Sequence, residues 1–189
     1  MKTLVPLLLL VVSLYATEEN SAHADINHYF FGIDLDWCKL ASDNNVSGAL
    51  LGGVQINSKF GIGAEYLHVL NDNSHPYNSD PQAVQYDIFG VLVEGGFPLN
   101  PNNRIVVPLL IGGGESYFTS PAFQTTQDLA WFFTGDLGLG IEHAISDNFR
   151  IALIGGYRMA KSPTRRGFGE SDINTAHVGI TLKFGDFPS

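Results

Sequence analysis

The chain has 189 residues, a formal net charge of −9 and a charged fraction of only 15%, against 44% hydrophobic residues. This length fits one domain, at most two, and the charged fraction is low beside the ~25% of a typical soluble domain. The acidic balance argues against a nucleic-acid partner, because phosphate binding requires a basic patch. The single cysteine, Cys38, rules out an intrachain disulfide and is interpreted as a small strand residue.

The first 24 residues have the pattern of an export signal. Lys2 precedes an apolar run over residues 4–15, which is shorter than the ~20 residues that a membrane-spanning helix needs. A polar stretch then ends in Ala22-His23-Ala24, which fits the small-residue pattern of a cleavage site. The sequence therefore predicts a signal peptide over residues 1–24 and one domain over residues 25–189. An uncleaved anchor is the alternative.

The rest of the chain alternates between apolar and polar residues with period two, which predicts β-strands with two different faces. In the first such run, Tyr29, Phe31 and Ile33 lie on one face, and Phe30 and Asp34 lie on the other. The fifth run has undecided faces, because a proline and three successive glycines interrupt it. Eight runs are found, at residues 29–37, 49–56, 60–66, 86–97, 105–117, 131–142, 149–158 and 177–184.

The connections between these runs alternate in length. They are short after the second, fourth and sixth runs ("NSK", "PLNPNN" and "AISDN") and longer after the other runs. Short turns at one end, long loops at the other and an even strand number are typical of a transmembrane β-barrel. One face of the runs carries almost no charge, as lipid requires, whereas a soluble barrel would place its polar face outside. The predicted fold is an all-β, eight-stranded antiparallel up-and-down barrel.

Two motifs carry a resemblance to a known family. The stretch "GDLGLGIEHAISDNFRIALIGGYR" (residues 135–158) is similar to the penultimate hairpin of the small OmpA-like and OmpX-like outer-membrane barrels. The stretch "HVGITLKF" resembles the terminal signal that such barrels present to the outer-membrane assembly machinery, with Gly179, Leu182 and Phe184 as its key positions. Because "GDFPS" follows, Phe187 is the other candidate for the recognised end.

This resemblance implies a place in the outer membrane of a Gram-negative bacterium. The implied partners are outer-membrane lipid, lipopolysaccharide, the barrel assembly machinery and host or surface ligands at the external loops. Neither a cofactor nor a metal ion is expected. Lys161, Arg165 and Arg166 form a basic stretch in one long loop and are a candidate contact for anionic polymers or lipopolysaccharide phosphates.

The alternation also places charged residues on the face that looks into the barrel. Because eight strands leave little internal space, we interpret these residues as a paired network that fills the lumen. An ion pathway or a proton relay is the alternative. The network is predicted to contain Asp34, Asp36, Glu65, Glu94, Asp136, Glu142, Arg150, Arg158, His177 and Lys183.

The expected function is non-enzymatic, because no nucleophile with an adjacent base is apparent. His143 and Ser146 have the wrong spacing for a barrel lipase and fall in a short turn. The leading interpretation is a surface protein that supports the envelope and presents loops for adhesion or host interaction. A small porin-like channel is the first alternative, and a lipid-modifying barrel enzyme is the second.

Overall fold

The computed structural model describes residues 28–40, 43–70, 73–77, 80–119, 126–161 and 173–188. The predicted signal peptide lies outside these residues. Within them, no helix is long and apolar enough to cross a membrane. The described strands are β1 (His28–Leu40), β2 (Asp43–Asn57), β3 (Phe60–Val69), β4 (Asn73–Tyr77), β5 (Asp80–Asn100), β6 (Asn103–Thr119), β7 (Thr126–Ser146), β8 (Phe149–Lys161) and β9 (Thr175–Gly185).

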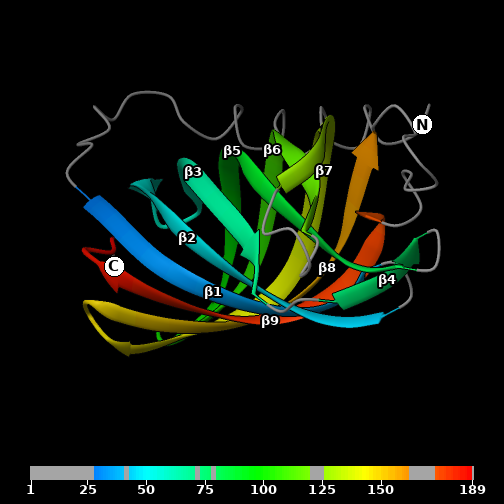
Figure 1. The fold of residues 1–189 in the computed structure, drawn as a ribbon. Helices are drawn as coiled ribbons and strands as arrows, with labels where there is room; N and C mark the ends of the chain where they lie inside the picture. Colours follow the sequence, from blue (N-terminus) through cyan, green and yellow to red (C-terminus); the bar gives the residue numbers. More distant parts are fainter. Residues whose placement is uncertain are drawn as a thin grey trace, which may run out of the picture.

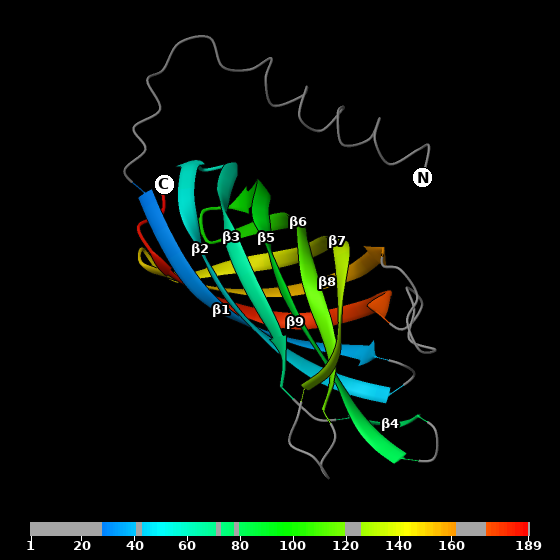
Figure 2. The same cartoon turned by 45° about the horizontal axis from the view of Figure 1, so that its top comes forward.

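Eight of these strands form a closed antiparallel barrel (Figure 1). Each barrel strand pairs with its neighbour in the chain, β3 pairs with β5, and β9 pairs with β1 to close the sheet. The predicted eight-stranded barrel is therefore confirmed, and each of the eight runs falls within one barrel strand. The short strand β4 was not predicted. It pairs antiparallel with the first residues of β5, where β5 projects beyond the barrel wall (Figure 2).

Three two-residue turns connect β2 to β3, β5 to β6 and β7 to β8 at one end of the barrel, which we name the turn end. A short polar side chain begins each turn. The side-chain oxygens of Asn57, Asn100 and Ser146 accept a hydrogen bond from the backbone N–H two residues later, at 2.8, 3.1 and 3.4 Å. This local bond reverses the chain with little help from the rest of the fold. The opposite end is the loop end.

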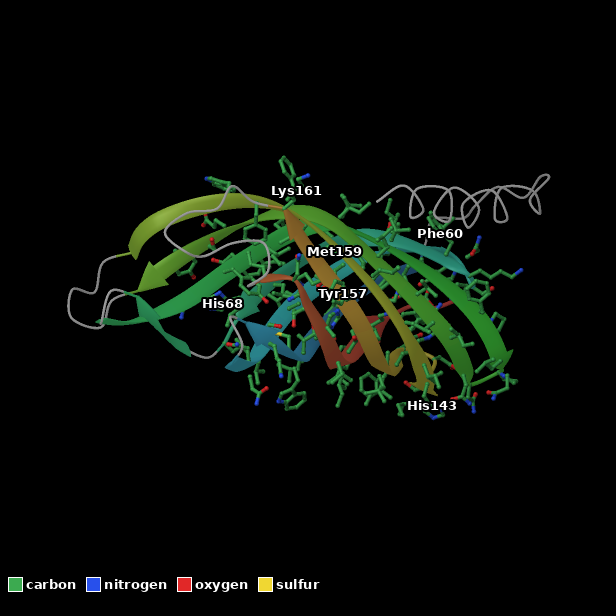
Figure 3. The ribbon with its side chains drawn as sticks, turned by 90° about the vertical axis from the view of Figure 1, so that its right-hand side faces the viewer. Phe60, His68, His143, Tyr157, Met159 and Lys161 are labelled. Atoms are coloured by element: carbon green, nitrogen blue, oxygen red, sulfur yellow. The ribbon has the colours of Figure 1, made fainter. Side chains whose placement is uncertain are left out.

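The two faces of the strands meet different surroundings, as the alternation predicted. Tyr29 and Phe31 are 62% and 63% exposed on the outside, whereas Phe30 between them is 5% exposed. The outer apolar face continues around the barrel and includes both tryptophans, Trp37 and Trp131. Figure 3 shows Phe60 and His143 at the turn end, His68 toward the loop end, and Tyr157, Met159 and Lys161 in order along β8.

Pro108 lies inside a barrel strand, where a proline is unusual. The β6–β7 register keeps its phase across this residue, but neither Val107 nor Pro108 is paired with β7. Proline has no backbone N–H, so the local gap in the ladder is expected. On the neighbouring strand, a β-carbon at Gly138 would lie 2.9 Å from the Pro108 ring, so glycine makes room for it. The undecided faces of this strand are thereby settled: Arg104, Val106 and Leu110 are buried in the lumen.

Candidate functional site

Side chains fill the lumen in three apolar clusters and in charged groups that lie among them. The smallest apolar cluster contains Val106, Ala152 and Ile154. The cluster at the turn end contains Phe30, Leu51, Leu92 and Phe187. The cluster toward the loop end contains Ala49, Leu67, Val69, Tyr86, Ile88, Leu110, Phe132, Ala160 and Ile173.

The first charged group, which we name the turn-side cluster, consists of Glu94, Arg104, Glu142, Arg150 and Lys183. Arg104 binds both carboxylates, with its Nη2 2.8 Å from Glu94 and its Nε 2.7 Å from Glu142. Lys183 also contacts both carboxylates, at 2.9 Å from Glu142. Arg150 Nη1 adds a contact of 3.1 Å to Glu142. Five strands contribute one residue each, and both carboxylates are satisfied by cations from different strands.

The second charged group is a closed ring of four residues, which we name the ion-pair ring. His177 places Nδ1 3.1 Å from Asp36 and Nε2 2.9 Å from Asp136. Arg158 places Nε 2.9 Å from Asp136 and Nη2 3.5 Å from Asp36. Both imidazole nitrogens therefore face a carboxylate, an arrangement in which each of them donates. Arg158 also donates from Nη1 to the hydroxyl of Tyr86 at 2.8 Å.

Two predicted network residues stand apart from these groups. Asp34 accepts a hydrogen bond of 2.5 Å from the hydroxyl of Thr181. The carboxylate of Glu65 makes no hydrogen bond or ion pair with any residue in the described ranges. Both carboxylates line a cavity of about 50 Å³ together with members of the ion-pair ring and Lys183. Because one water occupies ~30 Å³ of liquid, this cavity is large enough for water beside the two carboxylates.

All ten residues of the predicted network thus face the lumen, and the structure brings eight of them into the two charged groups. Arg104 was missed, although it contacts two of the predicted carboxylates. Its strand begins with Arg104, Val106, Pro108 and Leu110 on one face, and the proline among them hid the alternation. The inward direction of Arg104 could have been inferred from the outer residues Ile105 and Ile111.

The residues of the predicted assembly signal lie on β9. Phe184 is on the outer face, where its ring stacks on Phe31 and Phe149 with centroid distances of 5.4 and 4.7 Å. Gly179 faces inward, and a β-carbon there would collide with the carboxylate of Asp36. This glycine is therefore required by the ion-pair ring, independently of any role in assembly.

Neither His143 nor Ser146 belongs to a nucleophile–base pair of the kind that a hydrolase needs, among the residues that the structure describes. His143 Nδ1 lies 2.9 Å from the side-chain oxygen of Asn103, and the hydroxyl of Ser146 belongs to its turn. No three His, Cys, Asp or Glu side chains of the described residues are grouped as a metal site. Of the basic loop stretch, Lys161 is exposed at the end of β8, whereas Arg165 and Arg166 lie outside the described residues.

Comparison with known proteins agrees with this architecture. Residues 4–184 match the family model described as the outer membrane protein beta-barrel domain. The chain belongs to this family. Members span the outer membrane with strands, so the exposed apolar face of the barrel meets lipid, the turn end is periplasmic and the loop end is external. The family resemblance and the fold class expected from the sequence are both confirmed.

Solved structures of two other proteins share the fold of this family member. Neisserial surface protein A (NspA) has a TM-score of 0.62 at 9% identity, and the match covers 83% of this chain and 95% of that chain. Ail, the attachment invasion locus protein of Yersinia pestis, has a TM-score of 0.52 at 13% identity, and the match covers 84% of this chain and 96% of that chain. A second Ail structure, in complex with the heparin analogue sucrose octasulfate, has the same TM-score at 14% identity. No curated protein matches the chain.

Proposed function

We propose that this outer-membrane barrel is a non-enzymatic surface protein whose closed wall holds external loops for adhesion or host interaction. The single observation that carries this proposal is the filled lumen. The turn-side cluster and the ion-pair ring cross it, and a cavity of about 50 Å³ lies beside them. A barrel whose lumen passes no solute has its function at the external surface, which the loop end presents.

The chemistry of the loop ligand follows from the one basic stretch of an otherwise acidic sequence. Lys161 ends β8 on the outside of the barrel, and Arg165 and Arg166 follow it in the chain. Three positive charges close together attract sulfated or phosphorylated polymers. The complex of Ail with a heparin analogue supports an anionic polymer as the ligand class. Lipopolysaccharide phosphates carry the same charge, so the test must separate the two sources.

The first experiment tests whether the lumen is closed. The mature chain, residues 25–189, is refolded in detergent and added to a planar lipid bilayer, and its folded state is checked by heat-dependent mobility in gels. We expect folded protein without discrete conductance steps. Stable, reproducible steps would refute the closed lumen and would favour the small porin-like channel.

The second experiment tests the loop ligand. Binding to immobilised heparin and to lipopolysaccharide is compared for the native chain and for a variant in which Lys161, Arg165 and Arg166 are each changed to Gln. Lys59→Gln is the control, because it removes a positive charge at the opposite end of the barrel. We expect heparin binding in the native and control proteins and its loss in the triple variant. Equal heparin binding by the triple variant would refute this loop as the contact, and loss of lipopolysaccharide binding alone would assign the loop to the membrane.

A further inference from the structure

The chain turns back into the barrel directly after β9. The amide N–H of Asp186 donates to the carbonyl of Tyr29 on β1 at 2.9 Å. On the other side, Gly185 donates to the carbonyl of Asn148 at 3.1 Å, and the Asn148 side chain donates back to the carbonyl of Gly185 at 2.9 Å. His28 Nδ1 lies 3.0 Å from the Asp186 carboxylate. Both figures show the C mark beside the start of β1 (Figures 1 and 2).

This turn directs Phe187 into the periplasmic mouth of the lumen. Its side chain is 8% exposed and packs in the cluster with Phe30, Leu51 and Leu92. The guanidinium of Arg150 lies over its ring, 4.2 Å from the centroid. Arg150 Nε has no hydrogen-bond partner among the described residues, so the ring covers a cation that would otherwise face water. Phe187 is therefore a plug in the lumen, whereas Phe184 faces lipid.

The partners of residues 185–187 lie on both sides of one particular junction. Tyr29 and Phe30 belong to β1, the first barrel strand, whereas Asn148 and Arg150 belong to the turn and strand that precede β9. The β1–β9 ladder between them is the junction where the sheet closes on itself. The β1 partners approach residues 185–187 only after β1 and β9 have paired. Asn148 and Arg150 are already beside the end of β9 once the β8–β9 ladder has formed. The bond from Asp186 to Tyr29 and the packing of Phe187 in the cluster with Phe30 therefore need the closed sheet.

We propose that residues 186–188 form a latch across the β1–β9 junction. The latch closes after the barrel has closed, seals the periplasmic mouth with Phe187 and keeps the first and last strands together. It acts independently of any ligand that the loops bind. Interactions made only after the folding transition state slow unfolding without changing the folding rate. The latch is thus a device for kinetic stability of the barrel.

The kinetic test compares Phe187→Ala with the native chain, both refolded in detergent micelles. Phe97→Ala is the matched control, because Phe97 is 45% exposed on the outer face, on a strand away from the junction. We expect Phe187→Ala to unfold in urea about 100- to 1,000-fold faster, as loss of a buried phenyl group implies, with an unchanged folding rate. A folding rate reduced by the same factor would overturn a latch that closes last. An unfolding rate no faster than that of the control would overturn the latch itself.

The accessibility test asks whether the mouth opens without unfolding. In a Cys38→Ser background, Leu92→Cys places a thiol in the apolar cluster that contains Phe187, and Leu67→Cys places one in the apolar cluster toward the other end. With a small water-soluble thiol reagent and no urea, we expect Phe187→Ala to speed labelling at position 92 and to leave labelling at position 67 unchanged. Phe187→Leu, which keeps an apolar plug, should give an intermediate rate. Equal labelling at position 92 with and without Phe187 would refute the seal.

Discussion

Removing the guanidinium of Arg158 is the sharpest test of the ion-pair ring. Arg158 is 1% exposed and makes contacts of 2.9 and 3.5 Å to Asp136 and Asp36 and one of 2.8 Å to the hydroxyl of Tyr86. Hydrogen bonds to charged groups contribute ~1.5–3 kcal/mol each, and breaking a buried ion pair by removing one partner costs ~3–5 kcal/mol. We therefore expect Arg158→Met to lower the free energy of unfolding by about 4 kcal/mol.

The assay is equilibrium unfolding in urea, with the barrel in lipid vesicles. Trp37 and Trp131 are 55% and 69% exposed on the lipid-facing side, so their fluorescence reports the transfer from lipid to water. Lys161→Met is the matched control, because it removes an exposed cation from the same strand and should change stability by no more than ~1 kcal/mol.

A second variant separates lost packing from unpaired charge. Changing Asp36 and Asp136 to Asn together with Arg158→Met removes the two carboxylates that lose their guanidinium partner in the first variant and keep only His177. We expect this triple variant to recover more than half of the lost stability, because a buried ionic group replaced as a whole costs little. Two results would refute the reasoning: a single variant as stable as the native chain, or a triple variant as unstable as the single one.

Three further variants test other parts of the wall by the same assay. Gly179→Ala should destabilise the barrel by roughly 1–3 kcal/mol, since its new methyl group collides with Asp36; Gly135→Ala, which meets nothing within 4 Å, is its control, and equal stability of the two would contradict the collision. Leu139→Arg, at a position 62% exposed to lipid, should cost ~2–4 kcal/mol in vesicles; a neutral effect would mean that β7 does not face lipid there. Glu65→Gln should raise the urea midpoint at pH 8, because the carboxylate has no cation partner in the described structure; a lower midpoint would reveal a stabilising partner.

The strands and their faces could be predicted because lipid and lumen impose a strict period of two on the sequence. From Tyr29 to Trp37 every outward residue is apolar, and β8 from Phe149 to Arg158 departs from the rule only where Ile154 faces the lumen and Gly155 faces outward. The rule failed at Pro108, where a missing N–H and a small neighbour, Gly138, allow a residue that the pattern alone does not explain. It also gave no signal for β4, which lies in a polar connection beyond the barrel wall.

The pairing of the lumen charges could not be predicted, because alternation fixes the face of a residue but not its height in the barrel. Asp136 and His177 are 41 residues apart in sequence, and their contact depends on the register of β7, β8 and β9. The inward position of Phe187 depends on a chain reversal after Gly185, for which local sequence patterns give no rule. The pairing of the charges depends on the stagger of the strands, and the position of Phe187 depends on tertiary packing.

Every member of the turn-side cluster and of the ion-pair ring lies on a strand of the wall, and the turns at the periplasmic end are held by their own side chains. The charged network of the wall therefore takes none of its members from the long external connections, although Ile173, just before β9, packs in the apolar cluster toward the loop end. Such connections tolerate insertions and substitutions, so the exposed surface can diverge in sequence while the wall stays constant. The same separation makes the barrel a scaffold for display, onto which foreign peptide epitopes can be grafted at the cell surface.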